Sequence, residues 1–245
     1  MFNLKNHPFA VSAFFEKSIV LTFAVPKEEF VNLIPECLTL DTFNNQYAFI
    51  AIAMVQTKNL RPKGFPTFLG NDFFLIGYRI FVRYTNSKGK IYRGLYIIKS
   101  ETNKRKMTFF GNLFTHYNYT TTDITKSVST KKMLIESKKS DFNLEISTNL
   151  DAVSLPKNSP FKTWKEARKF AGPLPFTFTY NKKKKEILII EGVRSYWKPK
   201  PIKIENYHFN FLESLHLKNT TLANAFMIND IPYSWKKGKT ELWKN

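Results

Sequence analysis

The stretch FFGNLFTHYNY, residues 109–119, combines residue types that are suited to the wall of a small-molecule site. Five phenylalanine and tyrosine residues lie here with one histidine, two asparagines and a glycine. Aromatic rings form the apolar walls of ligand pockets, and a histidine or tyrosine among them can move a proton or orient a substrate. The alternative is that these aromatic side chains only fill the interior of the fold.

Arginines elsewhere in the chain could supply the charged group of such a pocket. In FFLIGYRIFVRY, residues 73–84, Arg79 and Arg83 alternate onto one face that also holds apolar side chains. An arginine on a partly apolar face can enter a cavity and bind a carboxylate, or it can mark a solvated face. The candidate ligand-binding residues are Arg79, Phe110, His116, Tyr117, Tyr119, Tyr180 and Arg194. No spacing shows that they meet, so the sequence identifies no catalytic residue.

Motifs of the common enzyme and cofactor classes are missing from the sequence. It has no glycine-rich phosphate loop, no nucleophile elbow, no HExxH zinc motif and no EF-hand loop. The histidines His7, His116, His208 and His216 lie far apart, and each has the alternative reading of a surface or hydrogen-bonded residue. The single cysteine, Cys37, excludes an internal disulfide and a cysteine metal cluster. We therefore expect no metal and no cofactor.

The formal net charge of +19 raises the question of a phosphate-rich partner. However, only seven of the 38 basic residues are arginine, and the lysines are scattered along the chain. The densest run, Lys182–Lys185, lies between two strand-like segments and is typical of a solvated hairpin tip. Nucleic-acid binding is therefore disfavoured. The longest apolar run, YAFIAIAMV at 47–55, is far shorter than the roughly 20 residues that cross a bilayer. We expect a cytoplasmic protein without a membrane partner, and the oligomeric state does not follow.

Strand patterns dominate the organisation of residues 1–245, which we expect to form a single domain. Hairpins are predicted for 73–84 with 91–99, for 131–137 with 142–147, and for 174–180 with 186–197. YAFIAIAMV is apolar on both faces, as in a strand covered on each side. Short helices are predicted at 27–34 after Pro26 and at 164–170, where Thr163 and Glu166 form a capping box. The fold class is therefore α+β and predominantly antiparallel β, with a large closed or nearly closed β-barrel and a few peripheral helices.

Five segments together resemble the uncharacterised domain-of-unknown-function 2071 family. They are LRPKGFP, NDFFLIGYRIFVRY, RGLYIIKSET, FFGNLFTHYNY and TFTYNKKKKEILIIEGVRSYWKP. Arg61, Pro62, Gly64 and Pro66 match the RPxGxP loop of that family, and Arg79 matches the arginine of its NVR strand, although Gly77 and Tyr78 replace the asparagine and valine. The family is similar to acetoacetate decarboxylase, which implies a mostly antiparallel barrel with helices outside and a pocket within.

The resemblance also indicates which chemistry is absent. In acetoacetate decarboxylases a glycine-led turn holds two lysines, one of which forms a Schiff base with the ketoacid. Aligning Phe110-Gly111 with that turn places Phe114 and Thr115 at the lysine positions, and the upstream Lys104, Arg105 and Lys106 are expected to be solvated. The resemblance therefore implies a barrel that binds a small apolar or carboxylate-bearing ligand without a Schiff-base lysine. A lyase or hydrolase that uses arginine, histidine or tyrosine in the same pocket is the main alternative, and a basic nucleic-acid-binding protein is the weaker one.

Overall fold

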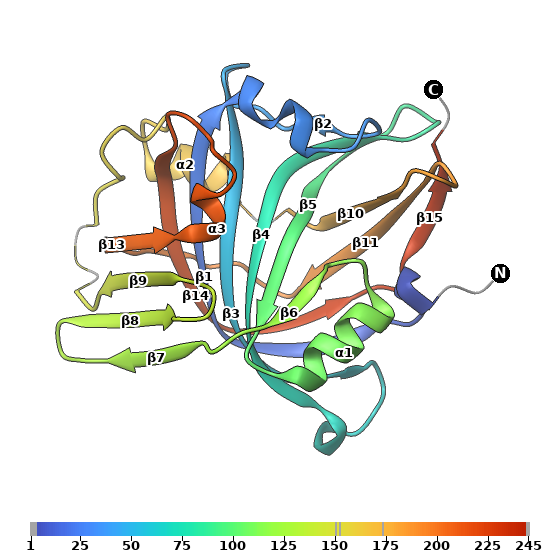
Figure 1. Ribbon diagram of the computed structural model, residues 1–245, viewed down its shortest axis with the longest axis horizontal. Helices are drawn as coiled ribbons and strands as arrows, with labels where there is room; N and C mark the ends of the chain where they lie inside the picture. Colours follow the sequence, from blue (N-terminus) through green and yellow to red (C-terminus); the bar gives the residue numbers. More distant parts are fainter. Residues whose placement is uncertain (1–3, 150, 152, 173, 244–245) are drawn as a thin grey trace.

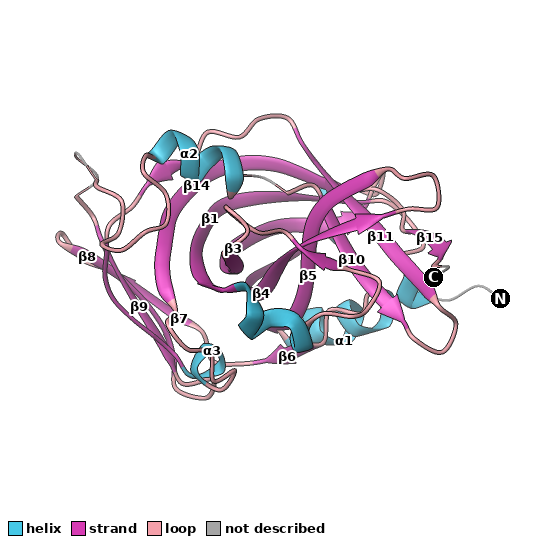
Figure 2. Ribbon diagram, turned by 90° about the horizontal axis from the view of Figure 1, so that it is seen from above, coloured by secondary structure: helices cyan, strands magenta, loops and turns pink. Residues whose placement is uncertain are grey.

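The computed structural model describes residues 4–149, 151, 153–172 and 174–243. Its main sheet is built around a nearly closed ring of seven strands (Figure 1). In ring order these are β14 (Thr221–Trp235), β1 (Val11–Pro26), β3 (Tyr47–Pro62), β4 (Asn71–Thr85), β5 (Ile91–Thr102), β10 (Phe176–Asn181) and β11 (Glu186–Arg194). Figure 2 shows from above how these strands curl around one another. The predicted fold class is confirmed.

Two short seams complete the ring. β11 pairs antiparallel with β14 over Gly192 to Arg194. β5 and β10 pair in parallel, with Phe176 opposite Gly94, whereas the other neighbours in the ring are antiparallel. Each of these two strand pairings joins only three residue pairs. Most of the paired residues of the ring therefore lie along the long strands β1, β3, β4 and β5.

Shorter strands extend or cover this ring. The main sheet also includes β2 (Thr39–Leu40), β6 (Tyr119–Thr121), β12 (Lys200–Pro201) and β15 (Lys239–Leu242). A second antiparallel sheet has the order β13 (Ile204–Phe209), β9 (Phe142–Ser147), β8 (Lys132–Ser137) and β7 (Thr125–Val128). The three predicted hairpins are confirmed as β4 with β5, β8 with β9, and β10 with β11.

The alternation in β4 assigns its two faces to different parts of the molecule. Ile76, Tyr78 and Ile80 are buried in the main apolar core, which also includes side chains of β8 and β9. The other face, with Leu75, Arg79 and Phe81, lies on a cavity described below. A period-two pattern therefore separates a packing face from a site-forming face within one strand.

The helices are short and lie around the strands. They are α1 (Arg105–Phe114), α2 (Trp164–Phe170), α3 (Asn210–Glu213) and the 3-10 helices η1 (Leu4–Asn6), η2 (Lys27–Leu33) and η3 (Thr67–Leu69). Helix α2 is confirmed, and the Thr163 hydroxyl accepts a hydrogen bond from the Glu166 N–H at 3.1 Å. The predicted helix after Pro26 forms as a 3-10 helix. Among the described residues no helix is both long and apolar enough to span a bilayer.

The interpretation of Phe110-Gly111 as part of a turn is wrong. Both residues lie inside helix α1, which spans 105–114. The turn was expected from the resemblance to acetoacetate decarboxylase, and glycine weakens an exposed helix by only about 1 kcal/mol relative to alanine. In this position Gly111 makes room for a neighbour, because a Cβ atom there would lie 2.4 Å from Cδ2 of Tyr119.

Candidate functional site

A cavity of about 450 Å³ lies inside the ring of strands. All seven ring strands contribute to its lining, together with α1 and the segment before β1. On β3 the lining residues Ala51, Ala53, Val55 and Thr57 are small or medium-sized, so that strand leaves space where larger side chains would fill it. Phe73, Leu75 and Phe81 of β4 add an apolar wall.

Arg79 brings a positive charge into this lining, and none of the described residues supplies a counter-charge to it. The side chain is half-buried on the cavity lining, and its Nε atom is fully buried with no hydrogen-bond partner. Among the described residues no carboxylate forms an ion pair with Arg79. Burial lowers the pKa of Arg79, and nearby tyrosines partly oppose this, but a guanidinium remains protonated in proteins.

Arg83 lies four residues after Arg79 on the same face of β4. Unlike Arg79, it has an acidic partner among the described residues. Its Nε donates to Oδ1 of Asp41 at 2.6 Å, and Arg93 contacts Oδ2 of the same carboxylate at 2.6 Å. Asp41 is fully buried between these two guanidinium groups. Arg83 is thus explained by a structural ion pair, whereas Arg79 is not.

Three tyrosines surround Arg79 closely enough to affect its pKa: Tyr117, Tyr119 and Tyr233. The Tyr117 hydroxyl is hydrogen-bonded to Oγ1 of Thr177 at 2.7 Å. Within the described part of the chain the hydroxyl groups of Tyr119 and Tyr233 have no hydrogen-bond partner, although both residues line the cavity. Burial raises the pKa of Tyr119 to about 12 and raises the pKa of the other two as well. All three are neutral hydroxyl groups at physiological pH, so Tyr119 and Tyr233 are available as donors.

The glycines of the site provide space for these groups. A Cβ atom on Gly77 would lie 2.9 Å from Nε of Arg79, and one on Gly192 would collide with the Tyr233 hydroxyl. A Cβ atom on Gly111 would likewise collide with the ring of Tyr119. Glycine therefore allows close packing of a cavity-lining side chain at three positions, of which Gly111 and Gly192 themselves line the cavity.

The charged residues that line the cavity have one sign. They are Arg61, Arg79, Lys106 and Arg194, and none of the described lining residues is Asp or Glu. The Arg194 guanidinium lies over the rings of Trp197 and Tyr233, at 4.8 and 5.6 Å from their centroids. Burial lowers the pKa of Arg194. A cavity with this lining favours an anionic ligand.

Comparison with known proteins gives the family of this fold. A family model described as an uncharacterized conserved protein, domain of unknown function 2071, matches residues 13–230. The chain belongs to this family. Searching curated proteins found no match.

Solved structures of the acetoacetate decarboxylase type are similar to this member of the family. Acetoacetate decarboxylase from Legionella pneumophila has a TM-score of 0.59 at 10% identity, covering 96% of this chain and 88% of its own. An acetoacetate decarboxylase-like enzyme from Sphingomonas wittichii RW1 has a TM-score of 0.55 at 10% identity, covering 98% and 94%. The enduracididine biosynthesis enzyme MppR complexed with pyruvate has a TM-score of 0.51 at 8% identity, covering 95% and 88%. At these identities the likeness shows the fold alone.

Five of the candidate residues taken from the sequence lie together in this family member. Arg79, Phe110, Tyr117, Tyr119 and Arg194 all line the cavity.

His116 and Tyr180, the other two candidates, are placed elsewhere. His116 Nε2 lies 3.2 Å from Oδ1 of Asn6, and burial, followed by the charge of Lys5, lowers its pKa. The Tyr180 hydroxyl donates to the Glu36 carboxylate at 3.0 Å. Tyr180 is an odd number of residues from Thr177 on β10, so the alternation of the strand turns Tyr180 away from the cavity face.

Tyr233 and His7 are among the lining residues that sequence reasoning did not select as candidates. Tyr233 lies on β14, where the alternation of the segment around it could have indicated an inward side chain. His7 is buried on the lining with a left-handed φ of 51°, and burial lowers its pKa. Both backbone polar groups of His7 are hydrogen-bonded. The N–H donates to the Phe114 carbonyl at 3.1 Å, and the carbonyl accepts from the Gly238 N–H at 2.8 Å. No local pattern in the sequence distinguished His7 from a surface histidine.

Of the basic residues 104–106, one lines the cavity. Phe114 and Thr115, which the comparison with the decarboxylase turn placed at the lysine positions, both line the cavity, but helix α1 stands where that turn was expected. Lys106 is the single lysine among the described lining residues, and it is exposed in the first turn of α1. Lys104 and Arg105 are exposed and do not line it.

Proposed function

We propose that this protein binds a small carboxylate-bearing molecule with an apolar body in the cavity, and that Arg79 holds the carboxylate. The observation that supports this most directly is a cavity-lining guanidinium that has no acidic partner among the described residues. A buried charged donor without a partner is costly, and a carboxylate supplies both the counter-charge and two acceptor atoms.

Neutral hydroxyl groups on the same cavity lining add hydrogen-bond donors for the carboxylate of the ligand. The hydroxyl groups of Tyr119 and Tyr233, which have no hydrogen-bond partner within the described part of the chain, line the same cavity as the guanidinium. A carboxylate oxygen that accepts from a guanidinium N–H has lone pairs left for a phenol. The apolar wall of Phe73, Leu75 and Phe81 suits the remainder of the ligand. The cavity volume of about 450 Å³ lies in the range of small-molecule sites, roughly 300–1,000 Å³.

Decarboxylation through an imine is not part of this proposal. The fold neighbours include acetoacetate decarboxylase and an enzyme complexed with pyruvate, so organic acids are a reasonable class of ligand to test. However, imine formation needs an unprotonated amine at the substrate, and Lys106 is exposed at the edge of the lining. We therefore infer binding rather than Schiff-base chemistry.

The test compares carboxylic acids with uncharged derivatives of the same shape. Calorimetric titration of the purified protein with pyruvate, acetoacetate, octanoate and decanoate, each alongside its methyl ester, measures the contribution of the carboxylate. We expect at least one acid to bind and its ester to bind about tenfold or more weakly, because a charge-assisted hydrogen bond contributes about 1.5–3 kcal/mol.

Two arginine variants locate the interaction. Arg79→Met should abolish the preference for the acid over the ester, whereas Arg105→Met, an exposed arginine outside the cavity lining, should leave it unchanged. Equal binding of acid and ester to the wild-type protein, or an unchanged preference in Arg79→Met, would contradict the proposed role of Arg79.

A further inference from the structure

The entrance of the cavity is marked by its exposed lining residues. Of the lining side chains, Leu69, Lys106 and Phe110 are exposed to solvent. Leu69 belongs to the loop between β3 and β4, residues 63–70, and the other two belong to helix α1. We call the surface formed by this loop, Arg61 and the first turns of α1 (residues 104–110) the mouth surface.

Large apolar side chains project from the mouth surface. Phe68 is 81% exposed, Phe109 65%, Phe65 54%, Leu69 49% and Phe110 39%. Within the described part of the chain, the four phenylalanines of this set are the phenylalanines with exposed side chains. Solvent exposure of several phenylalanines at one place is unfavourable in water, so it indicates a surface with a partner.

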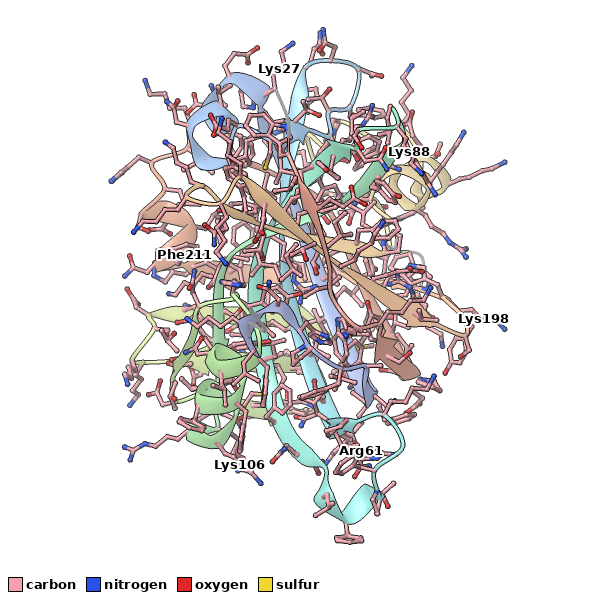
Figure 3. The ribbon with its side chains drawn as sticks, turned by 90° about the vertical axis from the view of Figure 1, so that its right-hand side faces the viewer. Lys27, Arg61, Lys88, Lys106, Lys198 and Phe211 are labelled. Atoms are coloured by element: carbon pink, nitrogen blue, oxygen red, sulfur yellow. The ribbon has the colours of Figure 1, made fainter. Side chains whose placement is uncertain are left out.

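Basic side chains surround these rings. Arg61, Lys63, Lys104, Arg105 and Lys106 belong to the mouth surface, and neither 59–70 nor 103–114 contains an acidic residue. Asp72, just beyond the loop, already forms an ion pair with Lys58 at 3.1 Å. Figure 3 shows Arg61 and Lys106 at the same end of the molecule, with Lys27 at the opposite end. The apolar rings and the positive charges therefore face the same partner.

The loop that bears Phe65 and Phe68 is held in place by Arg61. Its Nε donates to the Phe65 carbonyl at 2.8 Å, and an Nη donates to the Asn59 carbonyl at 2.8 Å. A 3-10 turn at Thr67–Leu69 then presents Phe68 at the tip. The aromatic tip is thus a fixed structural feature, stabilised by a side chain that also lines the cavity.

We propose that the mouth surface docks on an anionic phospholipid membrane. Phenylalanine and leucine side chains insert at the boundary between head groups and acyl chains, while lysine and arginine bind the lipid phosphates. A single-stranded nucleic acid would also attract basic and aromatic residues, but Leu69 and the projecting tip of the loop provide apolar insertion rather than a stacking platform. This inference revises the expectation from the sequence that no membrane is involved.

Docking in this orientation places the entrance of the cavity against the bilayer. A carboxylate with an acyl chain could then pass from the membrane to Arg79 without crossing water. This last step rests on the proposed function, whereas the docking itself does not.

Vesicle flotation of the purified protein tests the docking. The probes are vesicles of phosphatidylcholine alone and vesicles that also contain phosphatidylglycerol. We expect the protein to float only with the anionic vesicles and to be released as salt is raised, because screening weakens the attraction between lysines and phosphates.

Two double variants separate the apolar contribution from the charged one, and their residues lie outside the cavity lining. Phe68→Ser with Phe109→Ser should weaken partitioning by about a hundredfold or more, from the lost transfer of two aromatic rings. Lys63→Glu with Lys104→Glu should weaken it by at least about thirtyfold. The matched controls, Val31→Ser with Leu242→Ser and Lys88→Glu with Lys183→Glu, change exposed residues elsewhere by the same chemistry and should float like the wild type.

Several outcomes would overturn the proposal. They are flotation that is equal with both kinds of vesicle, mouth variants that float as well as their controls, and binding to single-stranded RNA but not to vesicles. A concentration-dependent dimer that Phe68→Ser converts to a monomer, with no flotation, would assign the surface to a second copy of the chain. Unchanged ligand titration and thermal unfolding of the mouth variants show that they remain folded, so the docking result stands apart from the cavity result.

Discussion

The guanidinium of Arg79 lies against the α-carbon of Gly77, two residues earlier on the same face of β4. A Cβ atom added to Gly77 would be 2.9 Å from Nε and 3.1 Å from an Nη atom of Arg79. Even an alanine at position 77 would therefore displace the arginine head group. The glycine fixes where the positive charge sits on the cavity lining.

Gly77→Ala should reduce binding of a carboxylate ligand more than it reduces stability. The contact is with the end of a flexible side chain, so the arginine moves while the backbone remains. We expect an affinity loss of about tenfold or more, measured by calorimetric titration, because a shifted guanidinium loses its hydrogen-bond geometry.

A double-mutant cycle checks that this effect acts through Arg79. In an Arg79→Met background, Gly77→Ala should cause no further loss of affinity, since the group that it displaces is gone. Additive losses in the cycle would show that Gly77 affects binding by another route.

Arg79→Met should stabilise the protein in the absence of ligand. The variant removes a buried Nε that has no partner in the described structure, a feature that costs about 1–3 kcal/mol, and replaces it with an apolar side chain. Thermal unfolding should show a higher Tm than that of the wild type. A lower Tm would mean that the guanidinium contributes to folding.

Arg83→Met is the matched substitution on the same face of β4, and it should have the opposite effect. It removes one of the two guanidinium groups that flank the buried Asp41 carboxylate. We expect a loss of about 1–3 kcal/mol in the free energy of unfolding, measured in urea, because a buried charge loses a hydrogen-bonded partner. Equal shifts in the two arginine variants would contradict this distinction.

Stability should fall in alkali because of the buried tyrosines. Burial raises the pKa of Tyr119 to about 12, and raises those of Tyr117 and Tyr233, relative to about 10 in the unfolded chain. Between the unfolded and folded pKa values, the folded state keeps a proton that the unfolded chain has lost, so the free energy of unfolding decreases. The contribution of these tyrosines to stability is therefore fully present below about pH 10 and is lost as the pH rises through the folded-state pKa.

Urea unfolding over this pH interval measures the effect. Each such tyrosine contributes a slope of up to about 1.4 kcal/mol per pH unit, so Tyr119→Phe should make the decline shallower. An identical pH dependence in the wild type and Tyr119→Phe would show that the hydroxyl of Tyr119 ionises as freely in the folded protein as in the unfolded chain.

Borohydride reduction in the presence of acetoacetate should leave the mass of the protein unchanged. Reduction traps an imine covalently, and the described cavity lining has a single lysine, Lys106, which is exposed at its edge. Intact-mass spectrometry gives the measurement. A single adduct that disappears in Lys106→Arg would identify Lys106 as an imine-forming residue and would overturn the assignment of binding without Schiff-base chemistry.

Local periodicity predicted the strand that positions the site. The alternation of 73–84 placed Arg79 on a face with Leu75 and Phe81, and the structure confirms that these three residues share the cavity lining. The same pattern in β10 separates Thr177 from Tyr180, but it does not show which of the two faces inward. That choice depends on how β10 joins the ring, which is set by non-local pairing with β5.

Non-local closure also explains what the sequence did not reveal. Tyr233 lines the same cavity as Arg79 because β14 pairs with both β1 and β11, and no short segment of sequence encodes that proximity. Helix α1 was missed because the resemblance placed Gly111 in a turn, and the benefit of this glycine within a helix appears only when Tyr119 packs against it.

The pairing of β1 with β14 has a consequence for how the protein is made. Val11 lies opposite Trp235, so a strand near the start of the chain obtains one of its two neighbours only after more than two hundred further residues have been synthesised. Until then the ribosome-bound chain exposes an open edge of β1, a site where strands of other nascent chains can add. Closure of the ring therefore waits for β14, and it is slow because the pairing of β1 with β14 has a very large sequence separation. The charge of +19 gives such chains mutual repulsion during this interval.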